Sequence, residues 1–410
     1  MKKYAFIFVL CFIPRLLYLI ITHPTIGTNL YWRLSESLLR WRILGFDGLK
    51  STTNEPLYPL FLAFSRWLAG DNFFLVLTSQ ILIACLGCVY LYKLSFLLSK
   101  SHPIARLAVF FYSFYPYFIR QSSAVGEVTL LTTLLIMSVY YYSNSRESKN
   151  AFFCGVAFGL AALARTVVLP IWLMSIAALV WKRKFLSAIL LSGTTFFLVA
   201  LLFFRNFQID KSIFPSRSGI NLFKGNCKFS DQIIPAYSVD LLNGYVFQVL
   251  REKAPELESG NENRLNQFFT DEAFKFMKEN PIRTMKLKVL NVIYLFYPRI
   301  VPFHPMGEAA RVTFQEGKIS VNGTLPRSAT AEWAHSIFYS FILAAAIFGI
   351  YLRRREFSND LILYFIILSF TIIYSLYWPA TRLRAPMDFV LMFYAASALN
   401  LFWCGLSRRD

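Results

Sequence analysis

The feature that most limits how this chain folds is a set of apolar runs about as long as a bilayer is thick. A helix needs ~20 mostly apolar residues to cross the hydrocarbon core of a membrane. Five runs approach or exceed this length, namely Tyr4–Thr22, Phe73–Leu98, Phe185–Phe204, Trp333–Leu352 and Leu361–Trp378. The composition agrees, because 56% hydrophobic residues with 42 Phe is unusual for a soluble domain. We therefore predict an all-α polytopic membrane protein, with residues 1–410 forming a single integral membrane domain.

The basic residues indicate on which side of the membrane each turn lies. A net charge of +19 would suggest nucleic-acid binding in a soluble protein, but here short basic clusters occupy alternate turns between the apolar runs. Such clusters stay in the cytoplasm. They are Lys2-Lys3, Lys100 with Arg106, Arg146 with Lys149, Lys182-Arg183-Lys184, Arg353-Arg354-Arg355 and Arg408-Arg409. We predict about ten spans, both termini inside, a location in the cell inner membrane and no nucleic-acid partner.

Shorter apolar segments and polar loops complete this plan. The shorter spans are expected at Ile104–Phe118, Val128–Tyr142, Phe152–Leu163 and Val167–Val180. The outer regions are 23–56 and 205–331, and 332–410 holds the last three spans. Helical spacing of apolar residues predicts helices over Leu30–Ile43, near Glu262–Lys278 and over Ile282–Tyr297, the first and last lying in the interface. Cys and His residues lack metal-ligand spacing, so we predict no metal and no cofactor.

The first outer loop, 23–56, contains the acidic residues best placed for chemistry. It holds three carboxylates, Glu36, Asp47 and Glu55. Glu55 precedes Pro56-Leu57-Tyr58-Pro59, in which two prolines fix φ and remove backbone donors. The chain must therefore turn back toward the membrane at a defined place. A carboxylate fixed at this boundary is a candidate general base.

Charged residues also lie where other outward spans end or begin. They are Glu127, Arg165, Arg205 beside Asn206, and Arg382 with Arg384. A charge at membrane depth costs roughly 2.5–3.5 kcal/mol on insertion scales, so each needs a partner, a wet cavity or a function. The predicted topology places all of them on the side of the first outer loop. Two arginines on the outer side, as in Trp378-Pro379-Ala380-Thr381-Arg382-Leu383-Arg384, also run against the usual charge rule.

The order of these elements resembles that of the GT-C glycosyltransferases. The resemblance is to bacterial members related to protein O-mannosyltransferases and to the aminoarabinose transferase of lipid A. It covers most of the chain, through Tyr31–Leu34, Glu55–Leu60, Ser113–Pro116, Gly126-Glu127, Gly159–Arg165, Arg205-Asn206, Ser218–Leu222 with Gly225-Asn226, and Arg382–Pro386. Each motif alone is weak, whereas the ordered set with a matching topology is fairly specific.

The resemblance implies an inverting transfer of a sugar from a polyprenyl phosphate to a glycan, lipid or protein acceptor on the outer, periplasmic side. A base must then activate the acceptor hydroxyl, and arginines must neutralise the leaving phosphate. It implies Glu55 or Asp47 as the base. The implied substrate-binding residues are Tyr58, Glu127, Arg165, Arg205, Asn206, Asn221, Arg382 and Arg384.

The sequence departs from the family pattern in the first outer loop. The family carries an acid three or four residues before the loop tyrosine, where this chain has Thr28 and Gly27, followed by Asn29. The base is then another loop carboxylate, with Glu55 preferred over Asp47 and Glu36, or the protein is an inactive or altered relative.

Each candidate also has a structural alternative. Glu55 is equally explained as a solvated loop acid, and Glu127 as a charge at a helix N-terminus. Arg165 and Arg205 would serve as anchors that reach the interface from helix ends. Two other functions stay open: a transporter or flippase for lipid-linked glycans, and a polymerase or ligase of O-antigen type. The transporter would favour broken helices in related halves, which the sequence does not show.

Overall fold

The computed structural model describes residues 2–24, 26, 29–145, 147–213, 215–257, 261–304, 306–315, 318–324 and 328–406. The predicted family positions Gly27 and Thr28, and the basic residues Arg146, Arg408 and Arg409, lie outside these ranges. In the described chain, five helices are long and apolar enough to cross a membrane. They are α1 (Lys2–Thr22), α4 (Phe73–Ser99), α10 (Phe185–Asp210), α16 (Ala329–Leu352) and α17 (Phe357–Leu376). The five long predicted spans are thus confirmed, and the chain is a multi-pass membrane protein.

Shorter helices fill the rest of the bundle. They are α5 (His102–Phe114), α6 (Pro116–Ser122), α7 (Val128–Ser143), α8 (Ser148–Ala164), α9 (Leu169–Trp181) and α19 (Asp388–Leu406). The span expected over Ile104–Phe118 is divided at Tyr115, whose extended backbone (φ −65°, ψ 114°) precedes Pro116. Proline disfavours a helical residue before it, which explains the break. The expected total of about ten spans stays a prediction.

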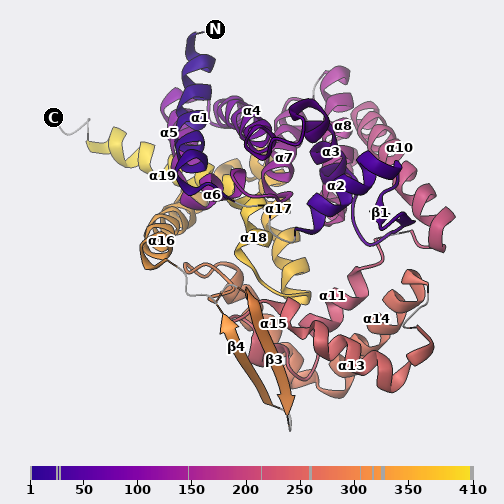
Figure 1. Ribbon diagram of the computed structural model, residues 1–410. Coiled ribbons are helices and arrows are strands. Elements are labelled where there is room, and N and C mark those ends of the chain that lie inside the picture. Colours follow the sequence, from indigo (N-terminus) through magenta and orange to yellow (C-terminus); the bar gives the residue numbers. More distant parts are fainter. Residues whose placement is uncertain are drawn as a thin grey trace.

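The long helices pack side by side in the bundle of Figure 1. Helix α4 contacts α1, α5 and α7, α8 lies against α7 and α10, and α19 lies between α16 and α5. Glycines permit two of the closest approaches. A Cβ at Gly155 would lie 1.7 Å from Thr194 Oγ1, and one at Gly349 would lie 1.9 Å from the Tyr394 carbonyl oxygen. Small residues at these crossings let the helix backbones approach, as is common in membrane helix pairs.

The loop before the second long helix folds as a compact layer against the bundle. It contains α2 (Leu30–Trp41), β1 (Gly45–Phe46), β2 (Leu49–Lys50) and α3 (Leu57–Ala69). The Asn29 side chain caps α2 by accepting from the backbone N–H groups of Tyr31 and Trp32. It also donates to the Val125 carbonyl at 3.1 Å. The start of α2 is therefore tied to the loop that precedes α7.

Residues 211–331 form a second part, below the bundle in the view of Figure 1. Its helices are α11 (Ser218–Gly225), α12 (Ser230–Ile233), α13 (Asn243–Lys253), α14 (Glu262–Glu279) and α15 (Pro281–Leu295). The predicted helices near Glu262–Lys278 and over Ile282–Tyr297 are confirmed as α14 and α15. We name residues 211–331 the outer part. It rejoins the bundle where α15 packs on α17.

An antiparallel hairpin in the outer part was not predicted from the sequence. It consists of β3 (Met306–Gln315) and β4 (Lys318–Thr324). Phe314 faces the helices, with ring centroids 5.2 Å from Phe229 and 5.7 Å from Tyr245. These aromatic contacts attach the hairpin to the outer part.

Short one-turn helices complete the chain. They are η1 (Thr166–Val168), η2 (Val239–Leu242), η3 (Pro255–Leu257), η4 (Arg354–Glu356), α18 (Thr381–Arg384) and η5 (Ala385–Met387).

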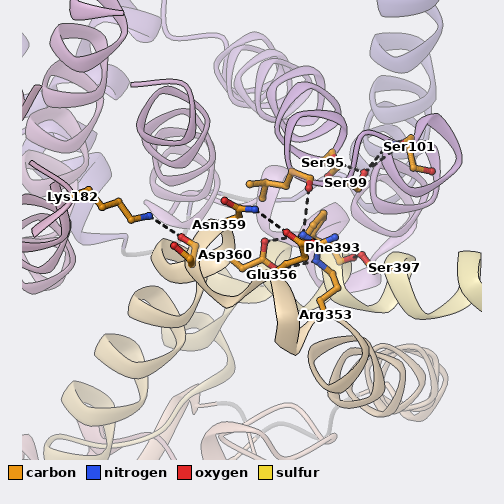
Figure 2. Close-up of polar contacts among 12 residues, drawn as sticks. Ser95, Ser99, Ser101, Lys182, Arg353, Glu356, Asn359, Asp360, Phe393 and Ser397 are labelled. Carbon is orange, nitrogen blue, oxygen red and sulfur yellow. Dashed lines mark hydrogen bonds and ion pairs between the residues drawn. The ribbon is translucent and has the colours of Figure 1, made fainter. Parts of the chain in front are cut away.

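The turn between α16 and α17 is fixed by the polar contacts in Figure 2. Arg353 donates from Nε and Nη2 to the two carboxylate oxygens of Asp360, at 2.8 Å each, and from Nη2 to the Leu98 carbonyl at 3.3 Å. Lys182 donates to the Ser358 carbonyl at 2.8 Å. Asp360 is fully buried. Arg353 thus does more than set topology, because it joins this turn to the end of α4.

Candidate active site

Two opposite charges meet at the adjoining ends of neighbouring helices. Glu127 directly precedes α7 and Arg165 directly follows α8, and these helices pack side by side. Arg165 Nη1 donates to Glu127 Oε1 in an ion pair whose side chains are 25% and 11% exposed. Because a buried charge needs a partner, each of these two residues compensates the charge of the other.

Glu55 lies next to this pair. Its Oε1 accepts hydrogen bonds from the backbone N–H of Thr166 at 3.1 Å and from the Thr166 hydroxyl at 3.2 Å. Thr166 follows Arg165, whose extended backbone (φ −163°, ψ 119°) ends α8 and presents the next N–H to the carboxylate. Glu55 is partly buried. The prolines after Glu55 and the start of η1 together hold one oxygen of the carboxylate and leave the second for another partner.

Tyr58 holds the loop that carries Glu127. Its hydroxyl donates to Gln80 Oε1 at 2.8 Å and accepts from the Gly126 backbone N–H at 2.7 Å. The Tyr58 side chain is buried, and the ring of Tyr31 meets it edge-on at 5.0 Å. Both hydrogen-bonding directions of the hydroxyl are used within the protein. The structure therefore supports a positioning role, and the predicted contact of Tyr58 with substrate stays a prediction.

A second group of charges approaches from the outer part. Lys224 Nζ lies 3.2 Å from Asp240 Oδ1, and Arg382 Nη2 lies 3.9 Å from Asp240 Oδ2. Lys224 is 1% exposed, whereas Arg382 is 53% exposed. Burial lowers the pKa of Lys224, and the carboxylate of Asp240 offsets part of this effect. The positive charge of Arg382 acts on both Glu127 and Asp240.

Lys224 and Asp240 were not among the predicted site residues. Lys224 follows the predicted motif Ser218–Leu222 by two positions on α11, but a single lysine on a short helix gives no functional signal. Asp240 lies in η2, in a stretch without a motif. Burial raises the pKa of Asp240, but the charges of Lys224 and Arg382 outweigh this and hold its pKa below the usual range. Asp240 is therefore ionised at neutral pH.

The surroundings of Arg384 differ from those of Arg382, although the two residues are only two positions apart. Arg384 is fully buried, and its Nε lies 3.1 Å from Asp388 Oδ1. Its other nitrogens donate to the Leu295 and Tyr297 carbonyls and to the Tyr115 hydroxyl, at 3.0, 3.3 and 3.2 Å. These contacts give Arg384 a structural role. The predicted contact of Arg384 with substrate stays a prediction.

Arg205 also donates its hydrogen bonds to other groups of the protein. It donates to the carbonyls of Leu44 at 2.9 Å and Ser51 at 2.6 Å, and to the side chain of Asn206 at 2.9 Å. Asn206 is fully buried beside it. Arg205 thus holds the β1–β2 loop against the end of α10, and phosphate binding by Arg205 or Asn206 stays a prediction.

The remaining predicted residues lie away from the Glu55 carboxylate. Asp47 is 81% exposed and pairs loosely with Arg33 at 3.6 Å. Glu36 pairs with Arg40 one turn along α2, at 2.7 Å. Asn221 lies on α11 in the outer part. Of the three loop acids, only Glu55 contacts the segment that follows Arg165, which favours it as the base.

The described residues contain no group of three or more His, Cys, Asp or Glu side chains arranged to hold a metal ion. That the reaction needs no metal stays a prediction.

Lys288 gives a pH dependence that can be tested. Its Nζ donates to Asn226 Oδ1 and to the Leu376 carbonyl, and burial lowers its pKa to about 8. Below that pH the buried ammonium destabilises the folded state. Because the unfolded chain keeps its proton to higher pH, stability rises from pH ~8 to ~10.5. We expect the melting temperature of the Lys288→Met variant to lack this rise, and an identical rise in both proteins would contradict the assignment.

Comparison with known proteins agrees with this arrangement. Residues 53–206 match the model of the dolichyl-phosphate-mannose-protein mannosyltransferase family. This segment begins two residues before Glu55 and ends at Asn206, so it includes Glu127 and Arg165. No curated protein matches the chain by sequence.

Solved structures share the fold of the whole chain. The oligosaccharyltransferase AglB from Archaeoglobus fulgidus, in complex with an inhibitory peptide and a dolichol-phosphate, aligns over 100% of this chain with a TM-score of 0.55 and 13% identity. The apo form of the Archaeoglobus fulgidus oligosaccharyltransferase aligns over 98%, with a TM-score of 0.54 and 16% identity. The chain spans 52% and 51% of these two proteins, so it is about half their length.

A third structure is ArnT from Cupriavidus metallidurans bound to undecaprenyl phosphate. It covers 90% of this chain and 72% of its own length, with 10% identity and a TM-score of 0.38. Residues 53–206 therefore match a protein O-mannosyltransferase family model, and the fold of the whole chain is similar to that of an oligosaccharyltransferase, in agreement with the predicted resemblance to GT-C glycosyltransferases.

Proposed function

We propose that this protein is a membrane glycosyltransferase that moves a sugar from a polyprenyl phosphate to an acceptor hydroxyl at the outer face of the membrane. One observation carries the proposal. The partly buried Glu55 carboxylate accepts a hydrogen bond from Thr166, which follows Arg165 of the Glu127–Arg165 pair, and the positive charge of Arg382 acts on Glu127. A carboxylate close to several cations is the arrangement that a phosphate leaving group and a hydroxyl nucleophile require, and this supports the proposal.

The proposed reaction is a single displacement. Glu55 takes the proton of the acceptor hydroxyl through its second carboxylate oxygen, and the acceptor oxygen attacks the anomeric carbon. The bond from that carbon to the phosphate oxygen breaks, and the electron pair leaves with the phosphate, so the configuration inverts. Arg382 neutralises the growing charge, because a guanidinium matches phosphate oxygens in geometry and charge. Lys224 pairs with the same Asp240 as Arg382 and keeps a second positive charge close to it, although the Lys224 side chain is buried.

The exposed guanidinium of Arg382 supports a role in donor binding. Its contact with Asp240 is long, at 3.9 Å, so a phosphate can displace or join it at low cost. We expect Arg382→Met to weaken donor binding about 10-fold or more, the loss of one charge-assisted contact of ~1.5–3 kcal/mol. Titration of the protein with a polyprenyl phosphate in nanodiscs measures this directly. An unchanged dissociation constant would reject the phosphate role of Arg382.

The same proposal includes about ten spans and an active site facing the periplasm or exterior. The apolar helices α7, α8 and α9, each shorter than a usual span, are then counted as crossings. We expect single cysteines at Lys100 and Lys182 to react with a membrane-impermeant thiol reagent only from the cytoplasmic side. Cysteines at Asp47 and Lys275 should react only from outside. Labelling of all four from one side would overturn the topology.

The match to AglB favours a second candidate, transfer of a whole oligosaccharide. That protein is an oligosaccharyltransferase that was solved with a dolichol-phosphate and a peptide. The donor distinguishes the two candidates. A monophosphate carrier with one sugar supports the first, and a diphosphate carrier with an oligosaccharide supports the second.

A further inference from the structure

A cavity of about 590 Å³ lies beside the β1–β2 loop. Its walls come from the end of α2, the β1–β2 turn and the end of α10, which lie together at one edge of the molecule (Figure 1). Three basic residues line it, Arg42, Lys50 and Arg205. No Asp or Glu belongs to its lining among the residues that the structure describes. The cavity is therefore electropositive.

The three cations have different tasks. Arg205 donates hydrogen bonds to the carbonyls of Leu44 and Ser51, and so holds the β1–β2 loop in place as one wall of the cavity. Arg42 and Lys50 are exposed, and within the described chain no side-chain hydrogen bond or ion pair engages either of them. The nearest acid in sequence, Asp47, points its carboxylate to Arg33. Two positive charges thus face the cavity uncompensated.

The approach to the cavity is apolar. Ile43, Leu49 and Ile209 line it beside the basic groups. Below it on α10, Phe197, Leu201 and Phe204 follow one another at helical spacing and are 66%, 56% and 63% exposed. Helix α10 is one of the five long candidate spans. The same face that meets lipid chains therefore leads up to the basic cavity at its outer end.

We infer that this cavity binds one anionic phospholipid, in which the phosphate headgroup carries a net negative charge. The headgroup phosphate lies between Arg42 and Lys50, and the hydrocarbon chains run along Phe204, Leu201 and Phe197. Charge complementarity selects the anionic headgroup, since Lys and Arg side chains near a membrane surface attract anionic lipid. The continuous apolar face selects a lipid over a free phosphate ion. This site shares neither Glu55 nor Arg165 with the candidate active site and does not depend on the proposed reaction.

Trp41 provides the probe, because it precedes Arg42 and its side chain is 47% exposed. The full chain is placed in phosphatidylcholine nanodiscs that contain a minor fraction of brominated phosphatidylglycerol, or the same fraction of brominated phosphatidylcholine. The contribution of Trp41 is the difference between wild type and Trp41→Phe. We expect an apparent affinity for the anionic lipid about tenfold or more above that for the neutral lipid, the effect of two cations.

Two double variants test the assignment. Arg42→Gln with Lys50→Gln should remove the preference for the anionic lipid. Arg264→Gln with Lys275→Gln removes the same charge from exposed positions on α14 and should keep it. Equal quenching by both lipids in the wild type, or a preference that survives loss of Arg42 and Lys50, would overturn the inference. Excess inorganic phosphate should leave the preference in place, and its abolition would show a site for the free anion instead of a lipid.

Discussion

Replacing Glu55 by Gln should lower the rate of sugar transfer about 10²–10⁴-fold, the usual contribution of a general base. Gln keeps the length and shape of the side chain. Its carbonyl oxygen still accepts from the Thr166 N–H and hydroxyl, now at 3.1 and 3.2 Å from the carboxylate. The fold and the affinity for the donor should therefore stay as in the wild type. The amide, however, takes no proton from the acceptor.

The matched control is Asp47→Asn in the same loop. Asp47 is 81% exposed and its only ion pair among the described residues is the 3.6 Å contact with Arg33. The variant removes the same charge eight residues away, so its transfer rate should equal that of the wild type. Initial rates and melting temperatures of both variants are compared. Full activity of Glu55→Gln, or loss of activity only in Asp47→Asn, would remove Glu55 from the role of base.

Replacing Arg384 by Met should lower the free energy of unfolding by about 3–5 kcal/mol, the cost of leaving a buried charge without its partner. Asp388 is 1% exposed and would lose that partner. The carbonyls of Leu295 and Tyr297 would lose the donor that ties α15 and the following turn to α18. The guanidinium also lies 3.6 Å from the ring centroid of Tyr339, so a cation–π contact is lost.

Arg382→Met is the control for this stability effect. It lies two residues earlier, is 53% exposed, and forms one long ion pair, so it should change the unfolding free energy by less than about 1 kcal/mol. Reversible unfolding in mixed micelles gives both values. Adding Asp388→Asn to Arg384→Met should recover part of the loss, because the orphaned charge is gone. Equal destabilisation by the two arginine variants would contradict the structural assignment of Arg384.

The contrast between these two arginines shows what the sequence predicts and what it leaves open. The run Arg382–Arg384 identifies two arginines on the outer side, which oppose the charge rule. It does not show which one is buried. That depends on how α18 places Arg384 against Tyr115, which is distant in the sequence, and against Asp388, which lies one turn further along the chain. Periodicity in a four-residue helix is too short to assign a face.

The position of Glu127 and Arg165 was easier to predict from the sequence. Both were placed on one side of the membrane, and the two helices that separate them form a hairpin, so their outer ends meet. The long helices follow directly from the apolar runs, since the bilayer fixes helix length. Hairpin β3–β4, Lys224 and Asp240 depend on packing in the outer part. There, short elements with mixed polarity carry no strong periodic signal.

The measurement that tests the central claim most directly is transfer of radiolabelled sugar from defined polyprenyl-phosphate donors in vesicles. Wild type, Glu55→Gln and Asp47→Asn are compared with monophosphate and diphosphate carriers. We expect label to move from a monophosphate donor to an acceptor with wild type and Asp47→Asn, and to stay on the carrier with Glu55→Gln. Label that stays on the carrier with wild type for every donor would contradict the proposed glycosyltransferase activity.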